Sequence, residues 1–170
     1  MMAASRRHHA EKLAKCGNDE FVQFVNFVAM SLVQGGKDRR FRCNLMKHYD
    51  PLKPPDPGQW RSIDEQVQIQ LVHDYHRRAR IRVPNAMAHS VVHVVVENQI
   101  ALGEETPVRR TVQRLISEGL DRHESIHAVG SVFIGHVNDL LRGPDPGAES
   151  NSSYYAALDR LTAKDWLRSG

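Results

Sequence analysis

Apolar residues recur at helical spacing over residues 21–33, and two glycines end the pattern. We expect an amphipathic helix there, preceded by a polar, basic arm over residues 1–18. Residues 35–60 show no such period, and four prolines lie between Pro51 and Pro57. Because neither a continuous helix nor a central strand tolerates so many prolines, this stretch predicts an ordered loop that crosses the surface.

A second helical pattern covers residues 62–81. Ser62 can cap this helix, with Glu65 three residues on to complete a capping box. Pro84 disfavours helical geometry in the residue before it, so we expect the helix to end near residue 81. Its apolar face comprises Ile63, Val67, Leu71 and Tyr75, with Ile69, Val72 and His76 beside it.

The next stretch, residues 85–102, is locally ambiguous. Five valines between residues 91 and 96 would suit a strand. However, Asn85 is a good N-cap, Gly103 is a good stop signal, and the stretch is too long for a typical strand. We therefore predict a helix.

Two further helices follow in quick succession. Thr106-Pro107, a capping residue followed by proline, begins one that Gly119 ends. Asp121 caps the other, which continues to about residue 141 and stops at Gly143-Pro144. A short helix, about Tyr154 to Leu167, closes the chain. The sequence thus predicts an all-α fold, a helical bundle of about four to five main helices with a long Pro-rich loop and a short C-terminal helix.

Length and composition fit one domain. The chain has 170 residues, of which 41% are hydrophobic and 25% charged. We divide it into a flexible basic arm (1–18), a single helical domain (19–142) and a linker with a short C-terminal helix (143–170). No apolar run approaches the roughly 20 residues that span a bilayer, and the first helix makes a poor signal peptide. We expect a cytoplasmic protein that does not enter a membrane.

Histidine is the unusual residue of this sequence. There are ten histidines but only two cysteines, Cys16 and Cys43, whose separation fits no ligand pair. We therefore expect any metal to be held by nitrogen and oxygen. Because an α-helix turns about 100° per residue, His89, His93 and Glu97 share one sector about 80° wide. Imidazoles at this spacing can chelate one ion.

A second histidine pair lies in the string HESIH, residues 123–127. His123 and His127 are candidate ligands, and Glu124 takes the place of the general base in the HExxH motif of zinc peptidases. Glu124 has an ordinary alternative as the third residue after Asp121 in a capping box. Peptidases of that class need a nearby sheet edge to align the substrate, and the sequence shows no convincing strand.

The order of the helices brings the two histidine pairs together. Short connections imply that consecutive helices are antiparallel, so the 85–102 and 121–141 helices should be parallel. Both pairs lie in the first two turns, and at about 1.5 Å rise per residue their levels differ by only about 3 Å. His76, near the end of the antiparallel 62–81 helix, falls at the same end of the bundle. It is a further candidate ligand, with His73 as its alternative.

Such a set of imidazoles and carboxylates suits a divalent transition metal, zinc first, with iron, manganese or nickel as alternatives. Three other interpretations remain open. The histidines can form a polar cluster without metal. Glu97 can form a salt bridge with a nearby arginine instead of binding the ion. If the metal is catalytic, the protein is a metal-dependent hydrolase with Glu124 as the base.

A different class of function rests on arginine. Two groups are candidates for a nucleic-acid or protein-binding surface: Arg77, Arg78, Arg80 and Arg82 in one, and Arg39, Arg40 and Arg42 in the other. The net charge is only +3, no recognised nucleic-acid motif occurs, and arginine is also favourable at a helix C-terminus. Self-association into a homo-oligomer is compatible with this sequence.

The strings HSVVHVVVENQIALG and GLDRHESIHAVGSV carry both histidine pairs. Together they resemble an uncharacterised bacterial family, a domain of unknown function numbered 1841. That family has a His-x3-His helix followed by a later His-acid-x2-His group. The resemblance covers about residues 85–132. It implies a helical bacterial protein and a candidate metal binder, and it brings no reaction with it.

Overall fold

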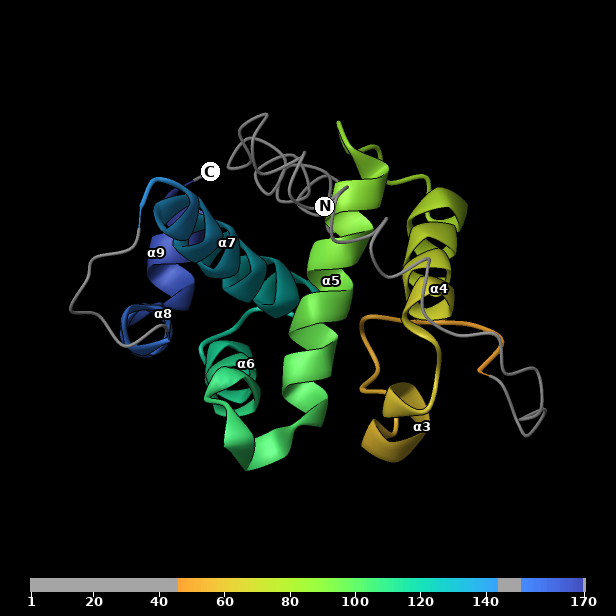
Figure 1. Ribbon diagram of the computed structural model, residues 1–170, viewed down its shortest axis with the longest axis horizontal. Helices are drawn as coiled ribbons and strands as arrows, with labels where there is room; N and C mark the ends of the chain where they lie inside the picture. Colours follow the sequence, from red (N-terminus) through yellow and green to blue (C-terminus); the bar gives the residue numbers. More distant parts are fainter. Residues whose placement is uncertain (1–45, 144–150, 170) are drawn as a thin grey trace.

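The computed structural model describes residues 46–143 and 151–169. In these ranges the chain forms seven α-helices and one 3₁₀ turn, with no strand, so the predicted all-α fold is confirmed (Figure 1). The elements are α3 (Pro57–Arg61), α4 (Glu65–Arg78), α5 (Ala86–Ala101), the turn Gly103–Glu105, α6 (Val108–Ser117), α7 (Arg122–Leu141), α8 (Ser152–Arg160) and α9 (Ala163–Arg168). The basic arm, the 21–33 helix and most of the linker lie outside the described residues.

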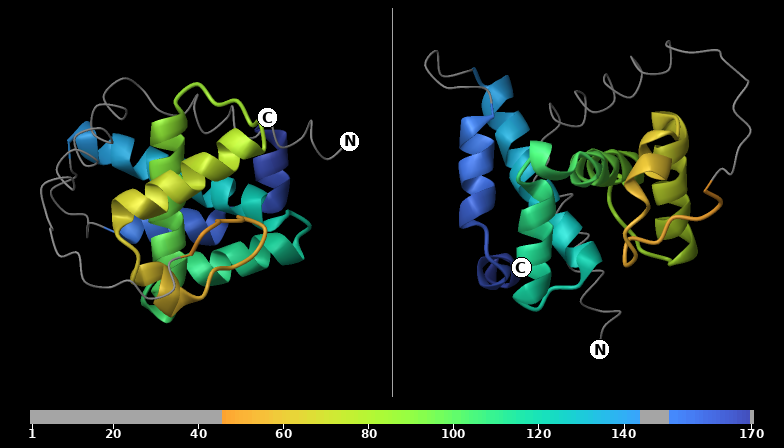
Figure 2. Two further views of the ribbon diagram at one scale, coloured as in Figure 1. Left: turned by 90° about the vertical axis from the view of Figure 1, so that its right-hand side faces the viewer. Right: turned by 90° about the horizontal axis from the view of Figure 1, so that it is seen from below.

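Helix α5 stands at the centre of the fold. Helices α3 and α4 pack on one side of it and α6 and α7 on the other, while α8 covers α6 and α7 from outside (Figures 1 and 2). Side chains around the whole circumference of α5 are buried, among them Val91, Val92, Val94 and Val96. Burial on all sides explains the near-continuous run of valines. None of the described helices is long and apolar enough to cross a membrane.

Helix α7 crosses α5 and does not run parallel to it, so this part of the prediction is wrong (Figures 1 and 2). The connecting helix α6 is short, and it packs against both of its neighbours without aligning them. The histidine pairs still meet. Both pairs lie in the first two turns of their helices, and the crossing lies there too.

Capping residues determine where the central helices begin. The side chains of Asn85 and Asp121 accept hydrogen bonds from Ala88 N and Glu124 N, as predicted. The start of α4 differs from the prediction, because Asp64 caps it through Gln66 N while Ser62 closes the preceding helix.

The Pro-rich segment is less irregular than predicted. Pro57 occupies the first position of α3, where its missing N–H costs no hydrogen bond, and Asp56 caps the helix. The segment also does more than cross the surface, because Tyr49, Pro51 and Trp60 are buried. Near the other end of the chain, the predicted last helix is two helices, α8 and α9.

Candidate metal centre

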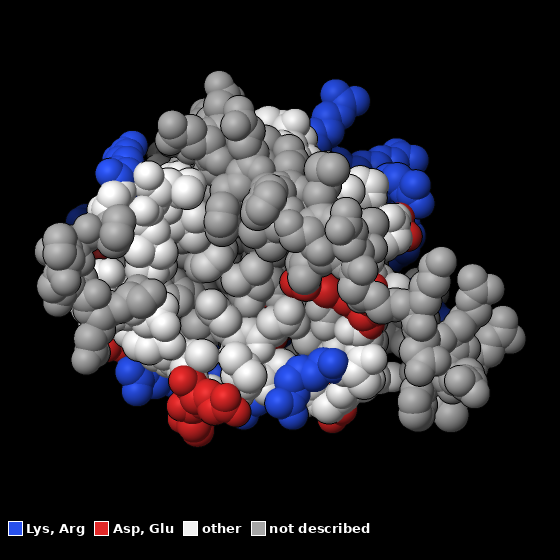
Figure 3. Space-filling view, viewed as in Figure 1, with Lys and Arg blue, Asp and Glu red and all other residues white. Residues whose placement is uncertain are grey.

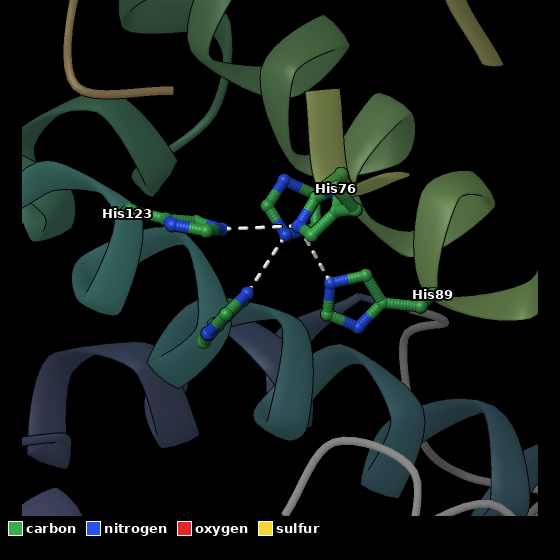
Figure 4. Close-up of side chains that lie close together, drawn as sticks. His76, His89 and His123 are labelled. Atoms are coloured by element: carbon green, nitrogen blue, oxygen red, sulfur yellow. Dashed lines mark hydrogen bonds between the residues drawn. The ribbon is translucent and has the colours of Figure 1, made fainter. Parts of the chain in front are cut away.

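Five buried histidines from three helices converge at one point. His76 comes from the last turn of α4, His89 and His93 from α5, and His123 and His127 from α7. One ring nitrogen of each lies within 4.8 Å of those of all the others, and the residues are only 0–5% exposed. Figure 4 shows the rings of His76, His89 and His123 turned toward one another. The structure thus joins the two predicted pairs and selects His76 over His73 as the fifth member.

The spacing of the nitrogens matches the ligand shell of a metal ion. His76 Nε2 lies 3.0 Å from His89 Nε2 and 3.2 Å from His123 Nε2, and His93 Nε2 lies 2.8 Å from His127 Nε2. Two nitrogens each about 2.1 Å from one ion would be about 3.0 Å apart at a right angle and about 4.2 Å apart on opposite sides. The largest separation, 4.8 Å, requires only a small inward movement of the rings.

The tautomer of His76 follows from its backbone contact. Its Nδ1 lies 2.9 Å from the carbonyl oxygen of Val72, one turn earlier on α4. A carbonyl can only accept, so Nδ1 carries the proton and donates it. In the neutral ring the lone pair is then on Nε2, which points at the other histidines. Metal-binding histidines commonly donate their other ring N–H to a carbonyl or carboxylate oxygen in this way, which fixes the orientation of the ring.

Burial favours the neutral form of His76, His89 and His93. It lowers the pKa of His76 to about 4, against a usual value of 6.5, although the bond to Val72 acts in the opposite direction. Burial also lowers the pKa of His89 and His93 well below that value, and the neighbouring histidines lower it further. A neutral imidazole is the form that binds a metal, so the site needs no deprotonation near neutral pH.

Two ring nitrogens of the cluster lack hydrogen bonds. Within the described part of the chain, Nδ1 of His89 and Nδ1 of His93 are buried and have no hydrogen-bond partner. A buried polar atom left in this way costs about 1–3 kcal/mol. A ring that binds a metal through Nε2 carries its proton on Nδ1, so these two nitrogens are the ones that face away from the point of convergence.

Glu97, a predicted ligand, does not belong to the convergent group. Its carboxylate accepts two hydrogen bonds of 2.7 Å from the guanidinium of Arg122, in a buried bidentate ion pair. It also accepts a 2.6 Å hydrogen bond from the hydroxyl of Tyr49. The structure therefore agrees with the alternative prediction, in which Glu97 forms a salt bridge with an arginine. Arg122 further donates to the carbonyl oxygen of Pro51, so the pair links α5, α7 and the Pro-rich segment.

Glu124 is half-buried on α7 and also lies outside the group of convergent donors. Its backbone N–H donates to the Asp121 carboxylate at 2.8 Å, which is the contact expected of its position in the helix cap. Its assignment as a catalytic base stays a prediction.

Aromatic rings that the sequence did not single out for the site close one side of the cluster. Tyr75 packs edge-on against His76 and His123, with ring centroids 5.3 and 5.7 Å away, and Tyr49 packs against Tyr75. Tyr75 is next to His76 in sequence, and this adjacency is the one sequence feature that could have placed Tyr75 near the cluster. Tyr49 lies 48 residues from Glu97, and no local pattern connects the two.

The first arginine group surrounds the end of α4. Arg77, Arg78, Arg80 and Arg82 are exposed, and basic side chains gather over this end of the helix and the following loop (Figure 3). Arg77 pairs with Asp74 at 2.9 Å. The second group, residues 39–42, lies outside the described residues, and nucleic-acid binding stays a prediction.

Comparisons with family models, with curated proteins and with solved structures find no match for this chain. The resemblance of residues 85–132 to the uncharacterised bacterial family therefore stays a prediction.

Proposed function

We propose that this protein binds one divalent transition-metal ion between α4, α5 and α7, with zinc as the first expectation. The observation that carries the proposal is the convergence of five buried imidazoles within 4.8 Å. Imidazole nitrogen is a common ligand of zinc, copper, iron and nickel, and three helices supply it here from separate parts of the chain.

The alternative is a polar cluster without metal. Such a cluster would be held by N–H···N bonds between the rings, and each neutral ring has only one proton to donate. His76 already donates its proton to Val72, so its Nε2 can only accept from His89 and His123. If His89 donates through Nε2, its Nδ1 is left as a buried lone pair without a partner. An ion that accepts several lone pairs at once accounts better for five inward-facing rings.

The number of protein donors favours a non-catalytic metal site over a catalytic one. Catalytic zinc sites commonly have three protein ligands and an open position for water or substrate. Five protein ligands would leave at most one position, and none of the five histidines is more than 5% exposed. A structural or metal-sensing role therefore fits the site better than a role for Glu124 as a base.

The proposal is tested by elemental analysis of untagged protein purified without chelator. We expect close to one zinc or other transition-metal ion per chain, and its loss in a His93→Gln/His127→Gln double variant. A matched control is His73→Gln on α4, because His73 lies outside the cluster. Metal far below stoichiometry in the wild-type protein, both as purified and after incubation with zinc, would contradict the proposal.

A separate variant tests the hydrolase alternative. We expect Glu124→Gln to keep the metal, because its carboxylate is not among the five convergent donors. If this variant retained metal but lost a measurable hydrolytic activity of the wild-type protein, the catalytic interpretation would replace the structural one.

A further inference from the structure

We propose that the site selects its ion: it takes a later first-row ion such as Co²⁺, Ni²⁺, Cu²⁺ or Zn²⁺ with five imidazole ligands, and it rejects Mn²⁺, Mg²⁺ and Ca²⁺. This inference rests on the proposed function and deepens it. Three features of the structure carry it: the chemical type of the donors, the charge around them and their number.

The donors are all of one type. Among the described residues, the convergent group contains five histidines and no carboxylate or thiolate. Hard ions such as Mg²⁺ and Ca²⁺ require oxygen ligands, and Mn²⁺ forms the weakest complexes of the first-row series with a given set of donors. Imidazole nitrogen suits the later ions of that series. The donor type therefore disfavours manganese, which the sequence alone left open.

Among the described residues, the convergent group itself contains no negatively charged donor. Glu97 is the nearest candidate along α5, but its charge is balanced by the guanidinium of Arg122 at 2.7 Å. The five donors are buried imidazoles, which carry no negative charge, so they would not compensate the two positive charges of a bound divalent ion. An ion that is bound mainly by electrostatic attraction gains little binding energy at this site. An ion that forms strong bonds to nitrogen does not depend on negative charge around the site.

The helix termini act in the same direction. Helices α5 and α7 both begin close to the cluster, since His89 is the fourth residue of α5 and His123 the second of α7. A helix N-terminus carries a partial positive charge that disfavours cations. Of the three helices that supply the histidines, α4 directs its C-terminal end toward the site, through His76. The two N-terminal ends disfavour a cation and the one C-terminal end favours it. Together the helix ends therefore disfavour ions that are bound mainly by electrostatic attraction.

The number of donors predicts the coordination geometry. His76 lies at short distance from rings of both α5 and α7, so it belongs to the same shell as the other four. Separations between 2.8 and 4.8 Å correspond to donors that surround an ion on several sides. We therefore infer a five-coordinate ion, and Co²⁺ is the suitable probe because its visible absorption depends on coordination number.

The experiment titrates untagged, metal-free protein with Co²⁺ and with Mn²⁺, alone and in competition. We expect Co²⁺ to bind at least about 100-fold more tightly than Mn²⁺, as the donor preference requires. The absorption of the Co²⁺ protein should be intermediate between the weak bands of six-coordinate and the strong bands of four-coordinate cobalt. Comparable binding of Mn²⁺ would overturn the selectivity, and a six-coordinate or four-coordinate spectrum would overturn the five-ligand set.

A variant pair tests the contribution of His76. We expect His76→Gln to weaken Co²⁺ binding by at least about 10-fold and to shift the spectrum toward four-coordinate cobalt. His73→Gln, one turn earlier on α4, should change neither. An unchanged spectrum in His76→Gln would contradict the inference that His76 is a ligand. If His76→Gln fails to fold, the comparison of Co²⁺ with Mn²⁺ in the wild-type protein still tests the selectivity. If no ion binds the wild-type protein at all, the proposed function itself fails, which is a different result from binding without selectivity.

Discussion

Glu97 and His93 lie one turn apart on the same face of α5, yet their partners differ. His93 meets His127 at 2.8 Å, whereas Glu97 is bound by Arg122 and Tyr49. Helical spacing predicted that both side chains face the interior, and this is correct. It could not predict which of them reaches the cluster, because Arg122 and Tyr49 are brought there by tertiary packing. The histidine pairs were predictable because each pair lies on a single helix.

At the scale of single residues, we expect the metal-free protein to lose stability as the pH falls from about 6.5 toward 4. His76 has a pKa of about 4 in the folded chain and about 6.5 when unfolded, so only the unfolded state gains a proton in this window. Each pKa unit is worth about 1.4 kcal/mol, so His76 alone accounts for a loss of at most about 3 kcal/mol.

Denaturant unfolding of chelator-treated protein near neutral pH and near pH 5 measures this effect. The His76→Gln variant should show a smaller pH dependence than wild type, because its side chain does not titrate. A free energy of unfolding that stays constant or rises on acidification would contradict the assignment of a buried, neutral His76.

At the scale of elements, the ends of the helices show what local sequence can and cannot specify. Gly103, Gly119 and Gly143 follow α5, α6 and α7 with positive φ, as the glycine stop signals predicted. Helix α4 ends in the same way but with Arg80, whose φ is 55°. No sequence signal marks an arginine for that conformation, so the predicted end was three residues too late. The valines of α5 show the converse, because burial on all sides overrides their strand preference.

We expect Arg80→Gly to stabilise the protein by about 0.5–1 kcal/mol. Ile81 N donates to His76 O and Arg80 N to Arg77 O, which is the Schellman pattern that favours glycine at this position. Arg80 is exposed, so the loss of its side chain removes little packing. Thermal unfolding measures the change.

Gly119→Ala provides the converse control, at the end of α6, where glycine already occupies the position with positive φ. Gly119 has φ 106° and open space around an added Cβ, so the substitution should destabilise through the backbone alone, by about 1 kcal/mol. Destabilisation by Arg80→Gly would show that the arginine side chain makes a contribution that its exposure does not suggest.

A third prediction concerns the ion pair that joins α5 to α7. Arg122→Met leaves the carboxylate of Glu97 buried without its charged partner, so we expect a loss of about 3–5 kcal/mol. Glu97→Gln/Arg122→Met should be less destabilised than the sum of the single variants. The exposed pair of Arg110 and Asp159 is the control, because Arg110→Met should cost less than about 1 kcal/mol. Additive effects of the two buried substitutions in denaturant unfolding would contradict direct coupling.

At the scale of the whole molecule, the histidine cluster ties together helices from both sides of α5. One apolar cluster packs Ile69 and Val72 of α4 against α5, and another packs α6, α7 and α8 together. His76 and the histidines of α7 reach the same point from these two sides. The all-α fold was predictable from periodicity and caps. The crossing of α7 over α5 was not, because it depends on how α6 packs between its neighbours.

We therefore expect the metal to stabilise the whole fold. An ion bound only by the folded state at about 100 times its Kd adds about 2.7 kcal/mol. The Tm should rise with zinc concentration and fall on chelation in the wild-type protein and in His73→Gln, and should respond to neither in His93→Gln/His127→Gln. A Tm in the wild-type protein that is independent of zinc would indicate that the histidines stabilise the fold without an ion.

The most direct test of the central claim is anomalous diffraction from crystals of the zinc-loaded protein, with data collected on both sides of the zinc absorption edge. The account predicts one strong peak per chain among His76, His89, His93, His123 and His127, about 2.0–2.1 Å from one nitrogen of each ring. Absence of a peak at this position, or a peak only at surface residues, would contradict it.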